Sequence, residues 1–199
     1  MISDEVILDS IRGPIRTHLI GSDTYRSLIS PDGGLRAMFG FHQGTEGEKV
    51  DAVIDRIIQE MTVKITKRKI SGTVLALDFD TVVLDYTKTS IFNMPEAIIT
   101  TDKGTNLRWL EWLLLEGSKR IIQGFHVVFV SGIKAEYSRS GAALMFRNGT
   151  FGVPLKHSGM KDNNWITRAL SDGENEPKAT LKTAFQIGIE TAVGRIMNA

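Results

Sequence analysis

An amphipathic helix followed at once by an alternating strand is the feature that most constrains the fold of this chain. Thr45 and Glu48 have the spacing of a helix-capping box. The helix that they begin has one apolar stripe, which consists of Val50, Val53, Ile54, Ile57, Ile58 and Met61. Apolar and polar residues then alternate from Thr62 to Arg68, as in a strand with one exposed face. The two periods in succession indicate an α+β fold.

The remaining apolar segments extend this pattern. Two runs, Thr73 to Phe79 and Thr81 to Tyr86, are separated only by Asp80 and are compatible with one long bent strand. Further predicted elements are a short buried helix over Trp109 to Leu114 closed by Gly117, strands over Phe125 to Val130 and Phe151 to Pro154, and a last helix over Lys178 to Met197. The apolar face of that last helix contains Leu181, Phe185, Ile189, Val193 and Ile196. We therefore expect helices packed on a mainly antiparallel sheet, with a C-terminal amphipathic helix.

The first 34 residues differ from the rest of the chain. One short helix is predicted from about Glu5 to Leu19, with an interruption at Gly13-Pro14, before a polar run that ends at Gly34. We expect residues 1–34 to form an N-terminal arm or loosely packed entry segment, and residues 35–199 to form a single α+β domain. The predicted core of that domain includes Val53, Ile57, Trp109, Trp112, Leu113, Phe129 and Phe185.

Composition excludes several classes of site. The chain has no cysteine, which excludes disulfides, thiolate metal sites and a cysteine nucleophile. Its 24 lysines and arginines nearly balance its 23 acids, so no overall positive charge holds nucleic acid. The four histidines, His18, His42, His126 and His157, lack metal-ligand spacing, and we expect neither a metal nor a cofactor. Without a signal peptide or an 18-residue apolar stretch, a soluble protein made in the cytoplasm and free of membranes is expected.

One enzymatic alternative rests on the segment VLALDFDTV from Val74 to Val82. It matches the opening motif of haloacid-dehalogenase-like phosphohydrolases. By that resemblance Asp78 attacks phosphorus, Asp80 acts as acid and base, and Mg²⁺ neutralises the phosphate. Ser131 after an apolar run, with Lys156 or Lys161, imitates the later motifs.

Three features oppose a hydrolase. About 77 residues precede the first aspartate, whereas that superfamily places it on the first strand of a parallel sheet. The acids after Lys161 lie in polar loops without an apolar strand before them, so a magnesium ion would lack ligands. The segment between Asp80 and Ser131 does not alternate strand and helix as βαβ units do. The favoured interpretation of Asp78 and Asp80 is solvent-facing acids on an edge or bent strand.

The densest polar chemistry lies between Tyr137 and Leu170 and is not arranged as a catalytic site. A turn is predicted at Asn148-Gly149, and one of three adjacent residues, Asp162, Asn163 or Asn164, is expected to cap a helical turn that starts near Trp165. From the residues alone, an ordinary hairpin and helix start with incidental polarity is the favoured explanation of this stretch.

Several motifs in order resemble the neck and tail-completion proteins of tailed bacteriophages. They are LRAMFGFHQGTEGEKVDAVIDRII, NLRWLEWLLLEGSKRIIQGFHVVF and YSRSGAALMFRNGTFGVPLKHSGMKDNNWITRAL, and they cover roughly residues 35 to 190. Ile133 to Glu136 and the first 34 residues have no counterpart in this resemblance.

The resemblance implies a structural virion protein, not an enzyme. Such a subunit assembles with its own copies into a ring in the neck, between the portal or connector and the tail terminator, tail tube or sheath, and DNA passes through it without sequence-specific binding. Residues expected to carry contacts are Tyr137, Arg139, Trp165 and Arg168. The number of subunits, six or twelve, stays open, as does the choice between the neck and the tail-terminator position.

Overall fold

The computed structural model describes most of the chain: residues 4–30, 34–41, 46–71, 74–100, 104, 106–117, 125–128, 144–147, 152–173 and 176–197. These residues divide into two compact units, each assembled from segments that are distant in sequence. Unit 1 comprises Met1–His18, Asp55–Thr89 and Leu170–Ala199, and unit 2 comprises Leu19–Ile54 and Ser90–Ala169. The sequence predicted an arm followed by one domain, whereas the described residues form two units. Residues 4–20 and residues 46–60 are helices that each run from one unit into the other.

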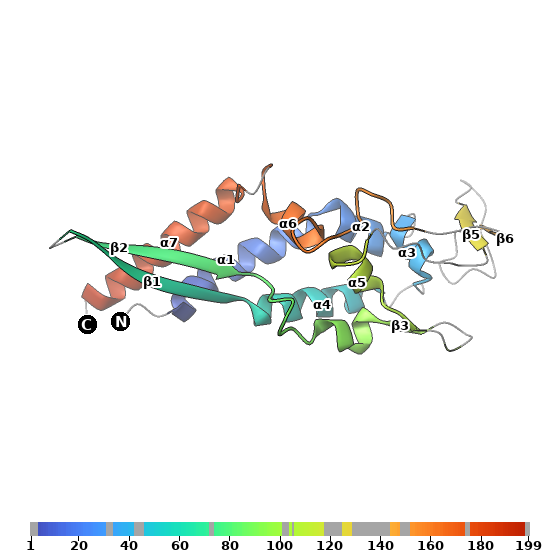
Figure 1. The fold of residues 1–199 in the computed structure, drawn as a ribbon, viewed down its shortest axis with the longest axis horizontal. Coiled ribbons are helices and arrows are strands. Elements are labelled where there is room, and N and C mark those ends of the chain that lie inside the picture. The colour runs from blue at the N-terminus through green and yellow to red at the C-terminus, as the bar shows by residue number, and fades with distance from the viewer. Residues whose placement is uncertain are drawn as a thin grey trace. The chain divides into compact units, whose positions relative to one another are not determined.

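The fold is α+β, as predicted (Figure 1). The helices are α1 (Asp4–Ile20), α2 (Asp23–Ile29), α3 (Gly34–Phe39), α4 (Glu46–Glu60), α5 (Trp109–Leu114), α6 (Trp165–Leu170) and α7 (Ala179–Met197), with 3₁₀ turns η1 (Ile91–Asn93) and η2 (Pro95–Ala97). The strands are β1 (Thr62–Ser71), β2 (Val74–Val82), β3 (Ile99–Thr100), β4 (Asn106–Leu107), β5 (Phe125–Val128) and β6 (Leu144–Arg147). Within the described ranges they form three antiparallel pairs, β1–β2, β3–β4 and β5–β6. The described ranges therefore contain three separate two-stranded pairs, and not the mainly antiparallel sheet that the sequence predicted.

Helix α4 and the β1–β2 hairpin confirm the strongest sequence prediction. The α4 stripe is buried at Val50, Val53, Ile54, Ile57 and Met61. The hairpin runs in register from Thr62 opposite Val82 to Lys69 opposite Leu75, with a shift before Ser71 pairs with Val74. Strand β2 continues through Asp80, so the two apolar runs around that residue form one strand that ends at Val82.

The N-terminal segment is helical and packed, which corrects the expectation of a loosely packed arm. Helix α1 continues through Pro14 without the predicted interruption. Its buried stripe, which extends on both sides of the proline, is Ile7, Leu8, Ile11, Ile15 and Leu19. Burial of several such side chains, at about 1.5–3 kcal/mol each, outweighs the roughly 3 kcal/mol that an interior proline costs. Packing on both sides therefore keeps the helix intact.

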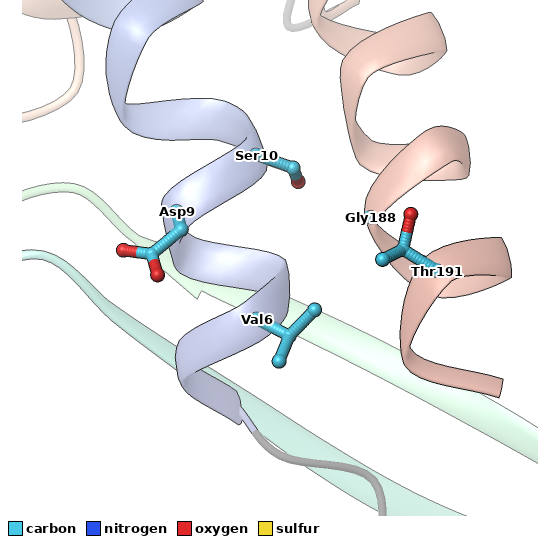
Figure 2. A pocket seen from close by; sticks show the side chains of 5 residues that line it. All are labelled: Val6, Asp9, Ser10, Gly188 and Thr191. Carbon is cyan, nitrogen blue, oxygen red and sulfur yellow. The ribbon is translucent and has the colours of Figure 1, made fainter. Parts of the chain in front are cut away.

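Helices α1 and α7 pack closely in unit 1. Figure 2 shows Val6 and Ser10 on α1 pointing toward α7, and Thr191 on α7 pointing back. A Cβ placed on Gly188 would lie 2.1 Å from the Ser10 Oγ and 3.3 Å from the Ile7 Cα. Only glycine allows the two backbones to approach this far. An open pocket of about 270 Å³ beside this crossing is lined by Val6, Asp9, Ser10, Gly188 and Thr191.

The buried face of α7 differs from the predicted one. Leu181 and Ala192 are buried together with Gly188, whereas Val193 is 37% exposed and Ile187 is 55% exposed. Periodicity alone favoured the larger residues, but the close approach of α1 selects the small ones. The helix was predicted correctly, but its predicted face was right only in part: Leu181 is buried, Phe185 and Ile189 are half-buried, and Val193 is exposed.

An aromatic cluster forms the core of unit 2. Phe39 contacts both Trp109 and Trp112, with ring centroids 6.4 and 5.7 Å apart, and Phe41 meets Trp109 edge to face at 5.4 Å. The Trp109 Nε1 donates a hydrogen bond of 2.8 Å to the Glu96 carbonyl oxygen, so its polar group is satisfied. Both tryptophans are buried, as predicted.

The other predicted core residues have mixed outcomes. Val53, Ile57 and Leu113 are fully buried, which confirms them. Phe185 is only half-buried, and Phe129 lies outside the described residues.

Candidate functional site

A loop in unit 2, residues 152–163, presents the most exposed large apolar side chains among the residues that the structure describes. Leu155 is 88% exposed and Met160 is 63% exposed. Lys156, Lys161 and Asp162, which surround them in sequence, are exposed as well. Exposed apolar side chains surrounded by charged residues are typical of a surface that contacts another protein. The short strand predicted over Phe151 to Pro154 is not formed at Gly152 to Pro154, and the chain there is irregular.

Two glycines fix the backbone of the 152–163 loop against the end of α5. The Gly117 N–H donates to the Gly159 carbonyl oxygen at 2.9 Å, and the Gly159 N–H donates to the Trp112 carbonyl oxygen at 3.2 Å. A Cβ on Gly159 would lie 1.8 Å from the Leu113 carbonyl oxygen, and one on Gly117 would lie 2.2 Å from the Gly159 nitrogen. Both positions therefore require glycine, because any side chain would force the two backbones apart.

His157 holds the centre of the loop from inside. Its side chain is 2% exposed, and a hydrogen bond of 3.0 Å joins its Nδ1 to the Oγ1 of buried Thr24 on α2. Burial first, and then the positive charges of Lys156 and Arg168, lower the pKa of His157 to about 4 against the opposing effect of Asp23. The imidazole is therefore neutral near pH 7.

Asn164 joins the loop to α6. Its side chain is fully buried, and its Nδ2 donates to the carbonyl oxygens of Met160 and Lys161 at 3.0 and 3.1 Å. Its Oδ1 accepts from the N–H groups of Ile166 and Thr167 at 3.0 and 3.2 Å. Of the three predicted caps, Asn164 is thus the one that begins the helix.

Trp165, expected as a contact residue, lies in the interior of unit 2. It is 1% exposed, and its Nε1 donates to the Ser22 Oγ at 2.8 Å. The same hydroxyl accepts from the Tyr25 N–H at 3.2 Å and donates to the Leu19 carbonyl oxygen at 2.6 Å. Trp165 therefore organises the fold, and it is not accessible to a partner in this structure.

Arg168 is also used internally. Its Nη2 donates to the Ser158 carbonyl oxygen and its Nη1 to the Asn163 Oδ1, both at 2.8 Å, and burial lowers the pKa of its guanidinium. These bonds clamp the far end of the 152–163 loop. Tyr137 and Arg139 lie outside the described residues.

The residues of the hydrolase alternative fall in different units. Asp78 and Asp80 lie on β2 in unit 1, where Asp80 is exposed and stands opposite Lys64 across the antiparallel ladder. Lys156 and Lys161 are exposed residues of unit 2. Over the described part of the chain, no group of three or more histidines and acids is placed to hold a metal ion.

The 152–163 loop lies within the segment that the sequence singled out, but its most exposed residues are not among those named there as contacts. Leu155 and Met160 were not predicted as contact residues because apolar residues are ordinarily assigned to the core. The role of Gly159 depends on a contact with Gly117, and nothing local in the sequence signals that contact.

Among the residues that the structure describes, no helix combines the length and the apolar composition needed to cross a membrane. Comparisons with known protein families, with curated proteins and with solved structures find no match to this chain.

Proposed function

We propose that this chain is a structural virion protein of a tailed bacteriophage, a subunit that forms a ring in the neck between portal and tail. The observation that carries the proposal is the 152–163 loop, a rigidly held loop whose most exposed side chains are Leu155 and Met160. This loop lies inside the stretch whose motifs resemble neck and tail-completion proteins.

The construction of the loop favours binding to another protein. His157, Asn164 and Gly159 hold it from within, so a partner would meet a surface that is already ordered. Association then costs little conformational entropy, because few torsions remain to be fixed. Met160 adds an unbranched, adaptable side chain of the kind that tolerates variation in the opposing surface.

Ring formation follows from one such contact repeated by rotation. A loop that binds a different surface on the next copy makes a heterologous contact, and this contact closes into a ring when the rotation permits. Neighbouring portal or connector proteins and tail terminator, tube or sheath proteins would bind the two faces. DNA would pass along the axis without sequence-specific binding, and no cofactor takes part. The proposed location is the virion, after synthesis in the host cytoplasm.

The assembly part is tested by measuring the mass of the purified chain over a concentration series, by sedimentation and native mass spectrometry. We expect association that is weakened at least tenfold by the double change Leu155→Asp and Met160→Asp. Ile187→Asp in unit 1 is the matched control, because Ile187 is a similarly exposed apolar residue. A control variant as impaired as the double variant would contradict the role of the loop, as would a chain that stays monomeric throughout.

The virion part is tested separately. The gene is expected beside those for portal, capsid and tail proteins, and quantitative mass spectrometry of purified phage particles should find the protein in multiples of six copies. A metabolic gene context together with absence from particles would contradict the proposal.

A further inference from the structure

The open pocket beside the crossing of α1 and α7 in unit 1 (the α1–α7 pocket) can bury an apolar side chain. The two hydroxyl groups in its lining already donate hydrogen bonds within their own helices. Ser10 Oγ donates to the Ile7 carbonyl oxygen at 2.6 Å, and Thr191 Oγ1 donates to the Ile187 carbonyl oxygen at 2.8 Å. The methyl groups of Val6 and Thr191 point into the space between the helices (Figure 2). An apolar guest therefore leaves neither hydroxyl proton unsatisfied.

The size of the α1–α7 pocket suits a partner's side chains. Its volume is about 270 Å³. Pockets that enclose drug-sized ligands and cofactors measure about 300–1,000 Å³, so this one lies just below that range. Its width depends on Gly188, whose missing side chain lets α1 and α7 approach closely. A shallow space of this size can take large apolar side chains that project from another protein.

The rim of the α1–α7 pocket is acidic on the α1 side. Asp9 lines the pocket, and its carboxylate points away from α7 (Figure 2). The side chains of Glu5 and Asp9 are 61% and 64% exposed, and Arg12 Nη1 bonds to both carboxylates, at 2.5 and 2.7 Å. Two acids and one arginine give this group a net charge of −1. A partner that suits the pocket is therefore apolar at its tip and positively charged beside it.

The 152–163 loop of unit 2 has this composition. Leu155 and Met160 are its most exposed apolar side chains, and each is followed by an exposed lysine, Lys156 or Lys161. Its two lysines and single acid give the loop a net charge of +1, because His157 is neutral near pH 7. The chain thus carries both an apolar, positively charged loop and an acid-rimmed pocket.

We propose that the 152–163 loop of one copy docks into the α1–α7 pocket of the next copy. Leu155 or Met160 enters the pocket, and the lysine that follows it lies near Asp9. The inference rests on the proposed function, because it names the surface that receives the loop in the ring. The loop belongs to unit 2 and the pocket to unit 1, so the two contacting surfaces differ and copies add head to tail.

The first test blocks the pocket with Thr191→Lys. Thr191 is exposed, and lysine favours a helix more than threonine does, so the fold should be retained. The new side chain would fill the pocket and repel the lysines of the loop. Sedimentation over a concentration series should show association at least tenfold weaker than that of the unmodified chain.

The matched control is Thr183→Lys on the same helix. Thr183 is also exposed, and its hydroxyl likewise donates to the carbonyl oxygen four residues earlier, at 3.1 Å. It does not line the pocket, so this variant should associate as the unmodified chain does. Ile187 does not line the pocket either, and Ile187→Asp therefore remains a control for the loop.

The second test mixes two variants that each lack one half of the contact. Thr191→Lys keeps an intact loop, and the double variant Leu155→Asp, Met160→Asp keeps an intact pocket. Native mass spectrometry distinguishes them by mass. The mixture should form a one-to-one complex and nothing larger, because both of its ends are blocked. Contact between identical surfaces, or a loop that docks within its own chain, would give no such complex.

The outcomes separate this inference from the proposed function. Normal association of Thr191→Lys, beside impaired association of the loop variant, would overturn the inference and leave the role of the loop intact. Equal impairment in Thr183→Lys, or a mixture without the one-to-one complex, would overturn it too. An unmodified chain that stays monomeric would contradict both proposals. Circular dichroism checks folding, and the uncharged Thr191→Gln replaces Thr191→Lys if that variant does not fold.

Discussion

The Trp165 Nε1 donates a hydrogen bond to the hydroxyl of Ser22, a residue 143 positions earlier in the chain. That hydroxyl also caps α2 by accepting from the Tyr25 N–H. One small side chain thus joins the start of α2 to the start of α6. This contact explains why a tryptophan that looks like a partner-binding residue in the sequence is buried.

The Ser22–Trp165 pair is predicted to be energetically coupled. Ser22→Ala removes a helix cap and leaves a buried indole N–H without an acceptor, so the free energy of unfolding should fall by about 2–4 kcal/mol. Trp165→Phe removes the donor instead. In urea unfolding the double variant should lose less than the sum of the single losses, because either change already breaks the bond. Strict additivity would contradict this role.

Gly159→Ala tests the close approach that anchors the 152–163 loop. The new Cβ would lie 1.8 Å from the Leu113 carbonyl oxygen, which belongs to the backbone and cannot rotate away. We expect a loss of more than about 2 kcal/mol in unfolding free energy. Gly152→Ala in the same loop is the control, since nothing lies within 4 Å of its Cβ position. Similar stabilities for the two variants would refute the anchoring role.

Local rules predicted the elements whose cause is local. The stripe of α4 and the cap at Asn164 arise from residues two to four positions apart, and both appear where expected. The alternation of apolar and polar residues in β1 likewise predicted a strand without reference to its partner β2. Such features depend on backbone geometry over one or two turns, and periodicity reports that geometry directly.

The candidate site depended on contacts that periodicity cannot report. Arg168 and Trp165 were expected at a surface, but Trp165 is buried and bonded to Ser22, which is 143 positions away, and the half-buried Arg168 bonds to the Ser158 carbonyl oxygen. The packed face of α7 was misjudged for a related reason, since Gly188 gains its importance only when α1 lies against it. Whether a polar residue is buried depends on the groups that contact it, and a single sequence does not identify those groups.

His157 should make stability depend on pH. Its pKa is about 4 in the folded chain and about 6.5 when it is unfolded, because burial opposes the charged form. Above pH 6.5 both states are neutral and the stabilising effect is complete. Between pH 6.5 and 4 only the unfolded state takes up the proton, so stability falls as pH falls.

The measurement is the free energy of unfolding by urea at several pH values. His157 should contribute a slope that approaches about 1.4 kcal/mol per pH unit near pH 5. His157→Gln retains a side chain that can bond to Thr24 and should remove this contribution. Identical pH profiles for the two proteins would show that His157 does not titrate in this way.

Gly188→Ala tests the helix crossing drawn in Figure 2. The added methyl group would lie 2.1 Å from the Ser10 Oγ and 2.9 Å from the Ser10 Cβ, so α1 and α7 must separate. A loss of about 1–3 kcal/mol is expected in thermal unfolding. Adding Ser10→Gly should restore part of it. Gly194→Ala, on the same helix with open space at its Cβ position, should instead be neutral or stabilise by up to about 1 kcal/mol.

Asp78→Asn separates the structural proposal from the hydrolase alternative. Asp78 lies on a two-stranded hairpin, where its described ladder partner is Thr66. As a strand residue without a catalytic role, it should tolerate this nearly isosteric change with a shift of about 0.5 kcal/mol or less in unfolding free energy. We expect neither protein to hydrolyse p-nitrophenyl phosphate with magnesium above the background rate. The opposite outcome is magnesium-dependent turnover by the unmodified chain that persists in the surface control Asp172→Asn and disappears in Asp78→Asn. That result would establish the enzyme and contradict a purely structural role.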